Sequence, residues 1–236
     1  MNSLTNGPLA PVLELLHQEA DAADRDLVAA MMAVLEAPGV TMEKVVAKVL
    51  GREKNYRENA SENVERFLAV SPLYGRFLYM TARACKATRI VEFGTSMGIS
   101  TIYLAAALRD NGGGHLISSE LQPDKVARAG ANLNAAGLDD LVDIREGDAL
   151  ETLTRLEGEV DLLLLDGAMT LYLPVLKLVQ PRLKSGAAVL AENAFEPGYL
   201  DYVRDPANGY LSLSLPDQQR GNEFAVRLSD RRSGTI

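Results

Sequence analysis

Several residue types are scarce in this 236-residue chain, and each shortage narrows the kind of protein that it can be. There is one cysteine, Cys85, so no disulfide can form within the chain, which is typical of proteins of the cytosol. We therefore expect a cytoplasmic protein in which this thiol packs as a small apolar side chain. The two histidines, His17 and His115, fall in a predicted N-terminal helix and at the start of a predicted strand, where we expect structural or solvated roles.

Long apolar runs and an excess of basic residues are also missing. No apolar run approaches the roughly 20 residues of a membrane span. The N-terminus lacks a basic region followed by a long apolar stretch, so we expect neither a signal peptide nor a membrane partner. Lys and Arg total 24 against 32 Asp and Glu, which gives a net charge of −8. This balance argues against a nucleic-acid partner, because sequence-independent binding of nucleic acid needs a basic surface.

The remaining composition is that of a globular protein with a substantial core. Apolar residues make up 47% of the chain, and the length fits one large domain. Residues 9–51 have helical apolar spacing interrupted by a Pro-Gly pair, and residues 52–63 are charged enough to form a linker or an exposed helix. We expect residues 1–65 to form an N-terminal helical segment that covers a pocket, contributes a dimer contact, or does both. Residues 66–236 then form the main domain.

From residue 89 onward, short apolar runs alternate with helical segments. Strands are predicted at 89–93, 115–120, 141–145, 160–165 and 186–191, and helices at 99–109, 123–136, 149–156 and 171–183. This alternation predicts βαβ units and a parallel sheet whose strands all end at one edge. Residues 210–215 and 224–228 read as a β-hairpin. The predicted fold class is therefore α/β, with a mostly parallel seven-stranded sheet that ends in an antiparallel hairpin.

The most informative stretch is residues 89–108, which reads as a strand, a tight glycine turn and a helix. Gly94 and Gly98 allow the backbone to approach a ligand closely, and the helix N-terminus after them presents unpaired N–H groups. A nucleotide-like or carboxylate-bearing ligand suits such a turn. Ser96 stands where the dinucleotide fingerprint G-x-G-x-x-G has its middle glycine, which disfavours a dehydrogenase.

Acidic or polar residues lie at the ends of the predicted parallel strands, where doubly wound sheets bind ligands. They are Glu92, Glu120, Asp148, Asp166 and the pair Glu192 and Asn193. Glu120 ends the second strand after the glycine turn, which is the position of a carboxylate that accepts hydrogen bonds from ribose hydroxyls. Three oxygen-bearing side chains at adjacent strand ends also suit a hard cation such as Mg²⁺.

Together these segments resemble the Rossmann-like S-adenosylmethionine (SAM) methyltransferases, and within them the catechol and caffeoyl-CoA O-methyltransferase type. The motifs that carry the resemblance are, in chain order, VSPLYG, VEFGTSMGIST, SSELQPDKVARAGANLNAAGL, IREGDAL, LLLLDG, AVLAEN and the final LSLP…GNEFAVRL. The resemblance covers residues 70–228. It implies the cofactor SAM, a small hydroxylated acceptor that is aromatic or a natural product, and a homodimer.

The resemblance also implies roles for individual residues. The residues that it places at the cofactor are Val70, Ser71, Glu92, Gly94, Thr95, Gly98, Ser100, Glu120, Leu121, Asp148, Ala149 and Asp166. Among them, Ser100 binds the SAM carboxylate, and Asp148 and Ala149 contact the adenine edge. Asp166, Glu192 and Asn193 form the implied site for Mg²⁺ or another divalent cation, which would activate the acceptor oxygen.

Two positions depart from the pattern of the family. Glu192 stands where the family has Asp, and Met169 stands where it has the lysine thought to act as general base. Asp166 and Tyr172 remain as candidates to orient the acceptor or take its proton. Three readings therefore stay open: a metal-assisted O-methyltransferase, a metal-independent O- or N-methyltransferase of a small molecule, and a protein that binds SAM without turnover.

Overall fold

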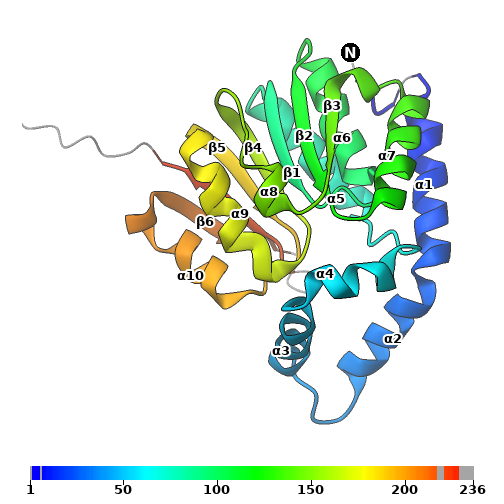
Figure 1. Cartoon of the computed structure of the whole chain (residues 1–236), viewed down its shortest axis with the longest axis vertical. Helices are drawn as coiled ribbons and strands as arrows, with labels where there is room; N and C mark the ends of the chain where they lie inside the picture. The colour runs from blue at the N-terminus through cyan, green and yellow to red at the C-terminus, as the bar shows by residue number, and fades with distance from the viewer. Residues whose placement is uncertain (1, 6, 217–220, 229–236) are drawn as a thin grey trace, which may run out of the picture.

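The computed structural model describes residues 2–5, 7–216 and 221–228, and its centre is one seven-stranded sheet (Figure 1). The strands are β1 (Arg89–Phe93), β2 (His115–Glu120), β3 (Val142–Glu146), β4 (Val160–Leu165), β5 (Leu183–Ala191), β6 (Tyr210–Ser214) and β7 (Glu223–Arg227). Their order across the sheet is β3-β2-β1-β4-β5-β7-β6, parallel up to β5 and antiparallel beyond it. The predicted fold class is confirmed, although residues 217–220 of the hairpin turn lie outside the described residues.

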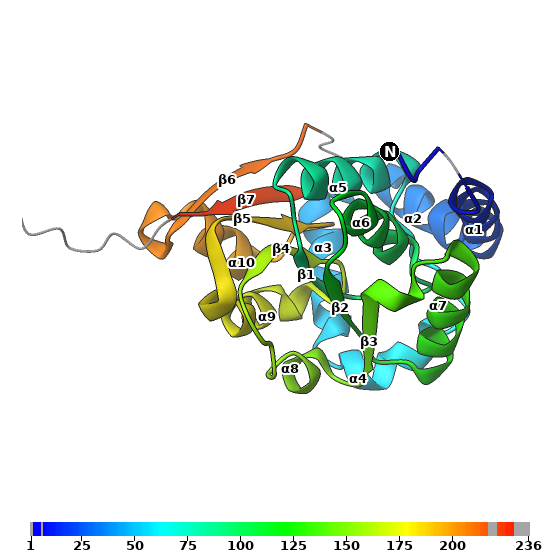
Figure 2. The ribbon, with the colours of Figure 1, turned by 90° about the horizontal axis from the view of Figure 1, so that it is seen from above.

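Helices cover both faces of the sheet, so the molecule has three layers (Figure 2). One face carries α5 (Pro72–Ala84), α6 (Ile99–Asp110) and α7 (Pro123–Ala136), and the other carries α8 (Ala149–Thr152), α9 (Tyr172–Val179) and α10 (Pro197–Arg204). Each face has its own apolar core, because the central strands bury side chains on both sides. α1 (Leu9–Ala23) joins the first of these cores and packs beside α6 and α7.

The carboxyl ends of the parallel strands are joined by backbone hydrogen bonds. Asp166 donates its N–H to the carbonyl of Phe93 at 2.8 Å, and Glu192 donates to Leu165 at 3.0 Å. β2 and β4 lie on opposite sides of β1, so the chain leaves β1 in one direction and returns on the other side. A crevice opens at such a reversal point, and the strand-end residues line it.

An excursion of the chain, residues 25–66, lies beyond these strand ends (Figure 1). It contains α2 (Arg25–Glu36), α3 (Met42–Glu53), α4 (Tyr56–Asn59) and η1 (Ala60–Asn63), none of which has a fully buried residue. The carboxylate of Asp24 accepts the N–H groups of Phe67 at 3.1 Å and Leu68 at 2.7 Å, so the two ends of the excursion are held together.

Some sequence expectations were wrong in detail. The predicted helix at 149–156 ends at Thr152, and β5 begins at Leu183 rather than at residue 186. The helix predicted at 171–183 gives way at Gln180 to a 3₁₀ turn that contains Pro181, which has no N–H to continue α-helical bonding. Cys85 does not pack inside the protein, because it caps the end of α5 and is exposed. No described helix is long and apolar enough to cross a membrane.

Candidate functional site

A cavity of about 580 Å³ lies between the carboxyl ends of the strands and the excursion. Its floor consists of residues that follow β1, β2, β4 and β5, and of the turn before α8. Its opposite wall comes from α2, α3 and α4. A volume of this size is typical of sites for cofactors and small molecules.

The glycine turn brings bare backbone to the cavity. Gly94 has a φ of +99°, and a Cβ there would lie 2.2 Å from the carbonyl oxygen of Asp166, so no side chain fits. Gly98 has a φ of +84° at the start of α6. Ser96 also has a left-handed φ, +47°, although it carries a side chain. Its Oγ donates to the carbonyl of Phe67 at 2.6 Å, which helps to hold this backbone conformation.

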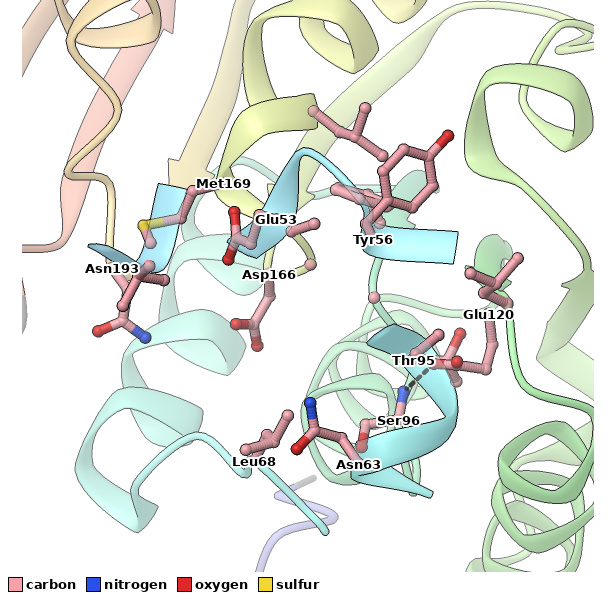
Figure 3. A pocket seen from close by; sticks show the side chains of 18 of the residues that line it. Glu53, Tyr56, Asn63, Leu68, Thr95, Ser96, Glu120, Asp166, Met169 and Asn193 are labelled. Carbon is pink, nitrogen blue, oxygen red and sulfur yellow. Dashed lines mark hydrogen bonds between the residues drawn. The ribbon is translucent and has the colours of Figure 1, made fainter. Parts of the chain in front are cut away.

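Glu120 holds the same turn from the end of β2. One carboxylate oxygen accepts the N–H of Ser96 at 2.8 Å, and the other accepts the N–H of Gln122 at 3.0 Å. Ser96 and Glu120 both line the cavity, and Figure 3 shows the hydrogen bond between them. The carboxylate is therefore fixed in place before any ligand binds, with lone pairs left to accept hydroxyl donors.

Asp148 lies at the same end of the cavity and is covered by α4. Its Oδ1 accepts the N–H of Leu150 at 2.8 Å, which caps α8. Its Oδ2 accepts Nε–H of Arg57 at 2.7 Å and also the hydroxyl of Tyr56. These bonds lower the pKa of Asp148 despite the opposing effect of burial. Residues 52–63 are thus not a linker, since they form part of the cavity wall.

Glu92 lies beneath the turn rather than in the cavity wall. It is fully buried, and the hydroxyls of Ser100, Thr101 and Ser118 each donate to it at 2.6 Å. Burial raises its pKa, which the three donated hydrogen bonds partly offset. Glu92 therefore anchors the first turn of α6 to β2, and with it the side chain of Ser100, which does line the cavity.

Comparison with known proteins shows which family this chain is similar to. Residues 91–194 match a family model described as a methyltransferase domain. The chain therefore resembles methyltransferases over this stretch. It is 35% identical over 135 residues to a catechol O-methyltransferase of Niastella koreensis, which covers 56% of this chain and 60% of that protein. It is 33% identical over 142 residues to a catechol O-methyltransferase of Mycobacterium tuberculosis, covering 60% of this chain and 64% of that protein.

Solved structures of methyltransferases share the fold of this chain. An O-methyltransferase of Bacillus cereus in complex with SAH superposes with a TM-score of 0.62 at 21% identity, covering 84% of this chain and 97% of that one. TomG of Streptomyces achromogenes in complex with SAM has a TM-score of 0.61 at 23% identity, covering 76% and 89%. The chain spans less than two thirds of the length of the two catechol O-methyltransferases.

The cavity brings together most of the predicted cofactor residues. Those that line it are Val70, Gly94, Thr95, Ser100, Glu120, Leu121, Asp148, Ala149 and Asp166. Ser71, Glu92 and Gly98 are not among the lining residues. Ser71 caps α5, with its Oγ accepting the N–H of Tyr74 at 3.2 Å, and Gly98 begins α6. Their structural roles are clear, and their contacts with a cofactor stay predictions.

The predicted metal ligands do not fit a three-ligand site as they are arranged. Asp166 and Asn193 line the cavity, but Glu192 is only 2% exposed and is not one of the lining residues. The described residues also contain no group of three or more His, Cys, Asp or Glu side chains placed to hold an ion. The longer side chain of Glu192 in place of Asp is consistent with this loss of ligand geometry.

Tyr172 is not suited to accept a proton. It is 1% exposed, and its hydroxyl donates to the backbone carbonyl of Glu192 at 2.6 Å. Burial, followed by the nearby carboxylates, raises its pKa well above the usual value, so the phenol stays neutral. Lys177 offers no substitute, since its Nζ lies 5.0 Å from the ring centre of Tyr202 and the residue does not line the cavity.

The excursion contributes lining residues that sequence reasoning missed. The polar ones are Arg52, Glu53, Tyr56, Asn59 and Asn63, of which Figure 3 labels Glu53, Tyr56 and Asn63. For Glu53 and Tyr56 the signal in the sequence was weak: an acidic and an aromatic residue next to an apolar helix, outside the stretch that carries the family resemblance. Their placement depends on how the excursion folds back over the strand ends.

Proposed function

We propose that this protein is a SAM-dependent O-methyltransferase that transfers a methyl group to a hydroxyl of a small, apolar acceptor, aromatic or a natural product. The supporting observation is that a single cavity joins two unlike surfaces. Its polar end, at Glu120 and Asp148, suits a ribose and an adenine. Its other wall is apolar and consists of Leu27, Met31, Leu35, Met42, Val45, Val46 and Val49. Asp166 lies in the same cavity.

The side chains of this site act mainly by placement. Bound SAM would supply the activated methyl group, and transfer to oxygen then requires alignment more than covalent help. Glu120 accepts hydrogen bonds from the ribose hydroxyls, and Gly94 lets the backbone lie against the cofactor. Asp166 orients the acceptor hydroxyl. The excursion excludes water from the space between them, which strengthens every polar contact within it.

Calorimetry with SAH tests the first half of this proposal, and turnover tests the second. We expect SAH to bind the purified full chain, and mass spectrometry to detect a methylated product from SAM and a panel of catechols and other small phenols. Binding without product from hydroxyl acceptors, together with product from amines, would favour N-methylation. Met169 in place of lysine is the observation that keeps this second candidate open.

Chelation should leave turnover nearly unchanged. Glu192 does not line the cavity, so the activity that we propose depends on protein groups and not on a divalent cation. We expect the rate after exhaustive EDTA treatment to stay within about 2-fold of the untreated rate, where loss of a true metal catalyst costs several kcal/mol. A rate that collapses with EDTA and returns with Mg²⁺ would restore the metal-assisted mechanism.

We propose that the excursion is a lid, fastened at the adenine end by Tyr56 and Arg57 on Asp148. Replacing both donors, Tyr56→Phe with Arg57→Ala, should speed SAH dissociation by about 10-fold, because two hydrogen bonds to the carboxylate of Asp148 are lost. The effect is no larger because the guanidinium is partly solvated. Stopped-flow competition measures this rate. Lys48→Ala removes an exposed charge from the same excursion and should leave the rate unchanged. An equal rate in the double variant would contradict the lid.

We also propose a cytoplasmic homodimer. The single cysteine supports the compartment. The exposed apolar side chains of α2 that do not line the cavity, Val28, Met32 and Val34, support a contact with a second copy, since clusters of such residues mark interaction surfaces.

A further inference from the structure

Glu53 is the one carboxylate that the excursion adds to the described cavity wall. It is the last residue of α3, after a helix whose other lining side chains are apolar apart from Arg52. Arg52 turns to Glu62, and both side chains of that pair are more than half exposed. At the end of the cavity near Met169, the charged lining residues are therefore Glu53 and Asp166 (Figure 3).

Two hydrogen bonds fix Glu53 against the loop that follows β4. Its Oε2 accepts the N–H of Thr170 at 3.1 Å, and its backbone carbonyl accepts the Thr170 hydroxyl at 3.3 Å. Thr170 lies in η3 (Met169–Leu171), directly after Met169. The Glu53 carboxylate therefore lies beside Met169, the position at which the methyltransferases that this chain resembles have a lysine. It reaches this place from α3, which is far from Met169 in the sequence.

The surroundings of Glu53 favour a proton acceptor. Burial is the largest influence on its pKa and raises it, while the backbone N–H groups of Thr170 and Met169 lower it to a smaller extent. A carboxylate with a raised pKa is a stronger base than one in water. Met169, which lines the cavity next to Thr170, is uncharged, so this position places no positive charge there that would lower the pKa of Glu53.

We propose that Glu53 is the general base of the methyl transfer, an inference that rests on the proposed O-methyltransferase function. Its carboxylate accepts the proton of the acceptor hydroxyl while the oxygen forms a bond to the methyl carbon of SAM. The bond between that carbon and sulfur breaks, and its electron pair stays on sulfur in SAH. The proton leaves Glu53 for solvent when the products depart.

If the role of Glu53 were purely structural, Glu53→Gln would have little effect on the rate, because the glutamine keeps the contact with Thr170. In Glu53→Gln the amide oxygen can still accept the N–H of Thr170, so the junction between α3 and η3 survives. Only the ability to take a proton is lost. Glu43→Gln removes the same charge from an exposed position on the same helix and serves as the matched control.

The test compares two acceptors, catechol and 4-nitrocatechol, at mildly alkaline pH. The nitro group makes the second acceptor an anion before it binds, so it needs no base. We expect Glu53→Gln to lower kcat on catechol by about 100-fold with an unchanged KM for SAM, and to lower kcat on 4-nitrocatechol by less than about 3-fold. Glu43→Gln should match the wild type on both acceptors.

Each other outcome has a definite meaning. Wild-type turnover with no loss in Glu53→Gln, or with equal losses on both acceptors, overturns the role of Glu53 and leaves the O-methyltransferase intact. No turnover by a wild type that binds SAH overturns O-methylation of these phenols and, with it, the role of Glu53. Melting temperatures of all variants, measured alongside, identify any loss that comes from unfolding.

Discussion

Replacing Glu120 with alanine is expected to weaken SAH binding by about 100-fold or more. A carboxylate that accepts two ribose hydroxyls makes two charge-assisted hydrogen bonds, each of about 1.5–3 kcal/mol. The same carboxylate holds the N–H of Ser96 at 2.8 Å, so its loss also loosens the turn that faces the cofactor. Titration calorimetry of the full chain with SAH measures the change directly.

A matched control is available on the neighbouring strand. Glu146 pairs with Glu120 in the register of β2 and β3, but it is exposed and does not line the cavity. Glu146→Ala should bind SAH as the wild type does. Equal affinity in Glu120→Ala, with an unchanged melting temperature, would remove the ribose assignment and the cofactor orientation derived from it.

Replacing Glu92 with alanine should lower the free energy of unfolding by about 3–5 kcal/mol. The change opens a cavity under the glycine turn and leaves three buried hydroxyls without their acceptor. Glu92→Gln keeps the volume and one acceptor oxygen, so it should cost about 1–2 kcal/mol. Denaturant unfolding of the three proteins measures both values. A loss below about 1 kcal/mol in the alanine variant would contradict the buried network.

The difference in the free energy of unfolding between the wild type and Glu92→Gln should change with pH in a direction set by the pKa of Glu92. Burial raises the pKa of Glu92 above its usual 4.5, so the folded state binds this proton more tightly than the unfolded state. The stability that protonation contributes is complete below pH 4.5 and is lost as the pH rises through the folded pKa. The difference in stability between the wild type and Glu92→Gln should therefore shrink as the pH rises across that range, whereas a constant difference would argue against the raised pKa.

The sequence predicted the architecture because its elements carry local signals. Residues 123–136 were predicted as a helix, and α7 has those bounds. The strands β1, β2 and β4 also match their predicted bounds. The boundaries that failed, in α8 and β5, are places where tertiary contacts decide how far a segment continues.

For the site, the sequence predicted the residues that follow strands. Glu120, Asp148 and Asp166 share one cavity because parallel strands all end at the same edge. The sequence did not predict how deeply each strand-end side chain is buried or which way it points. Glu92 and Glu192 also lie near strand ends, yet both are buried and neither lines the cavity. The hydroxyls that surround Glu92 come from α6 and β2, so the tertiary structure decides its depth.

By itself the sequence determined the order of the strands and helices along the chain, the glycine turn and the place of Glu120 at the end of β2, since all of these depend on neighbours in the chain. The tertiary structure alone decided that Tyr56 reaches Asp148 and that Glu53 reaches Thr170. These contacts join residues separated by 92 and 117 positions. No local periodicity encodes them, because they depend on an excursion that folds back over the sheet and is held at its base by Asp24.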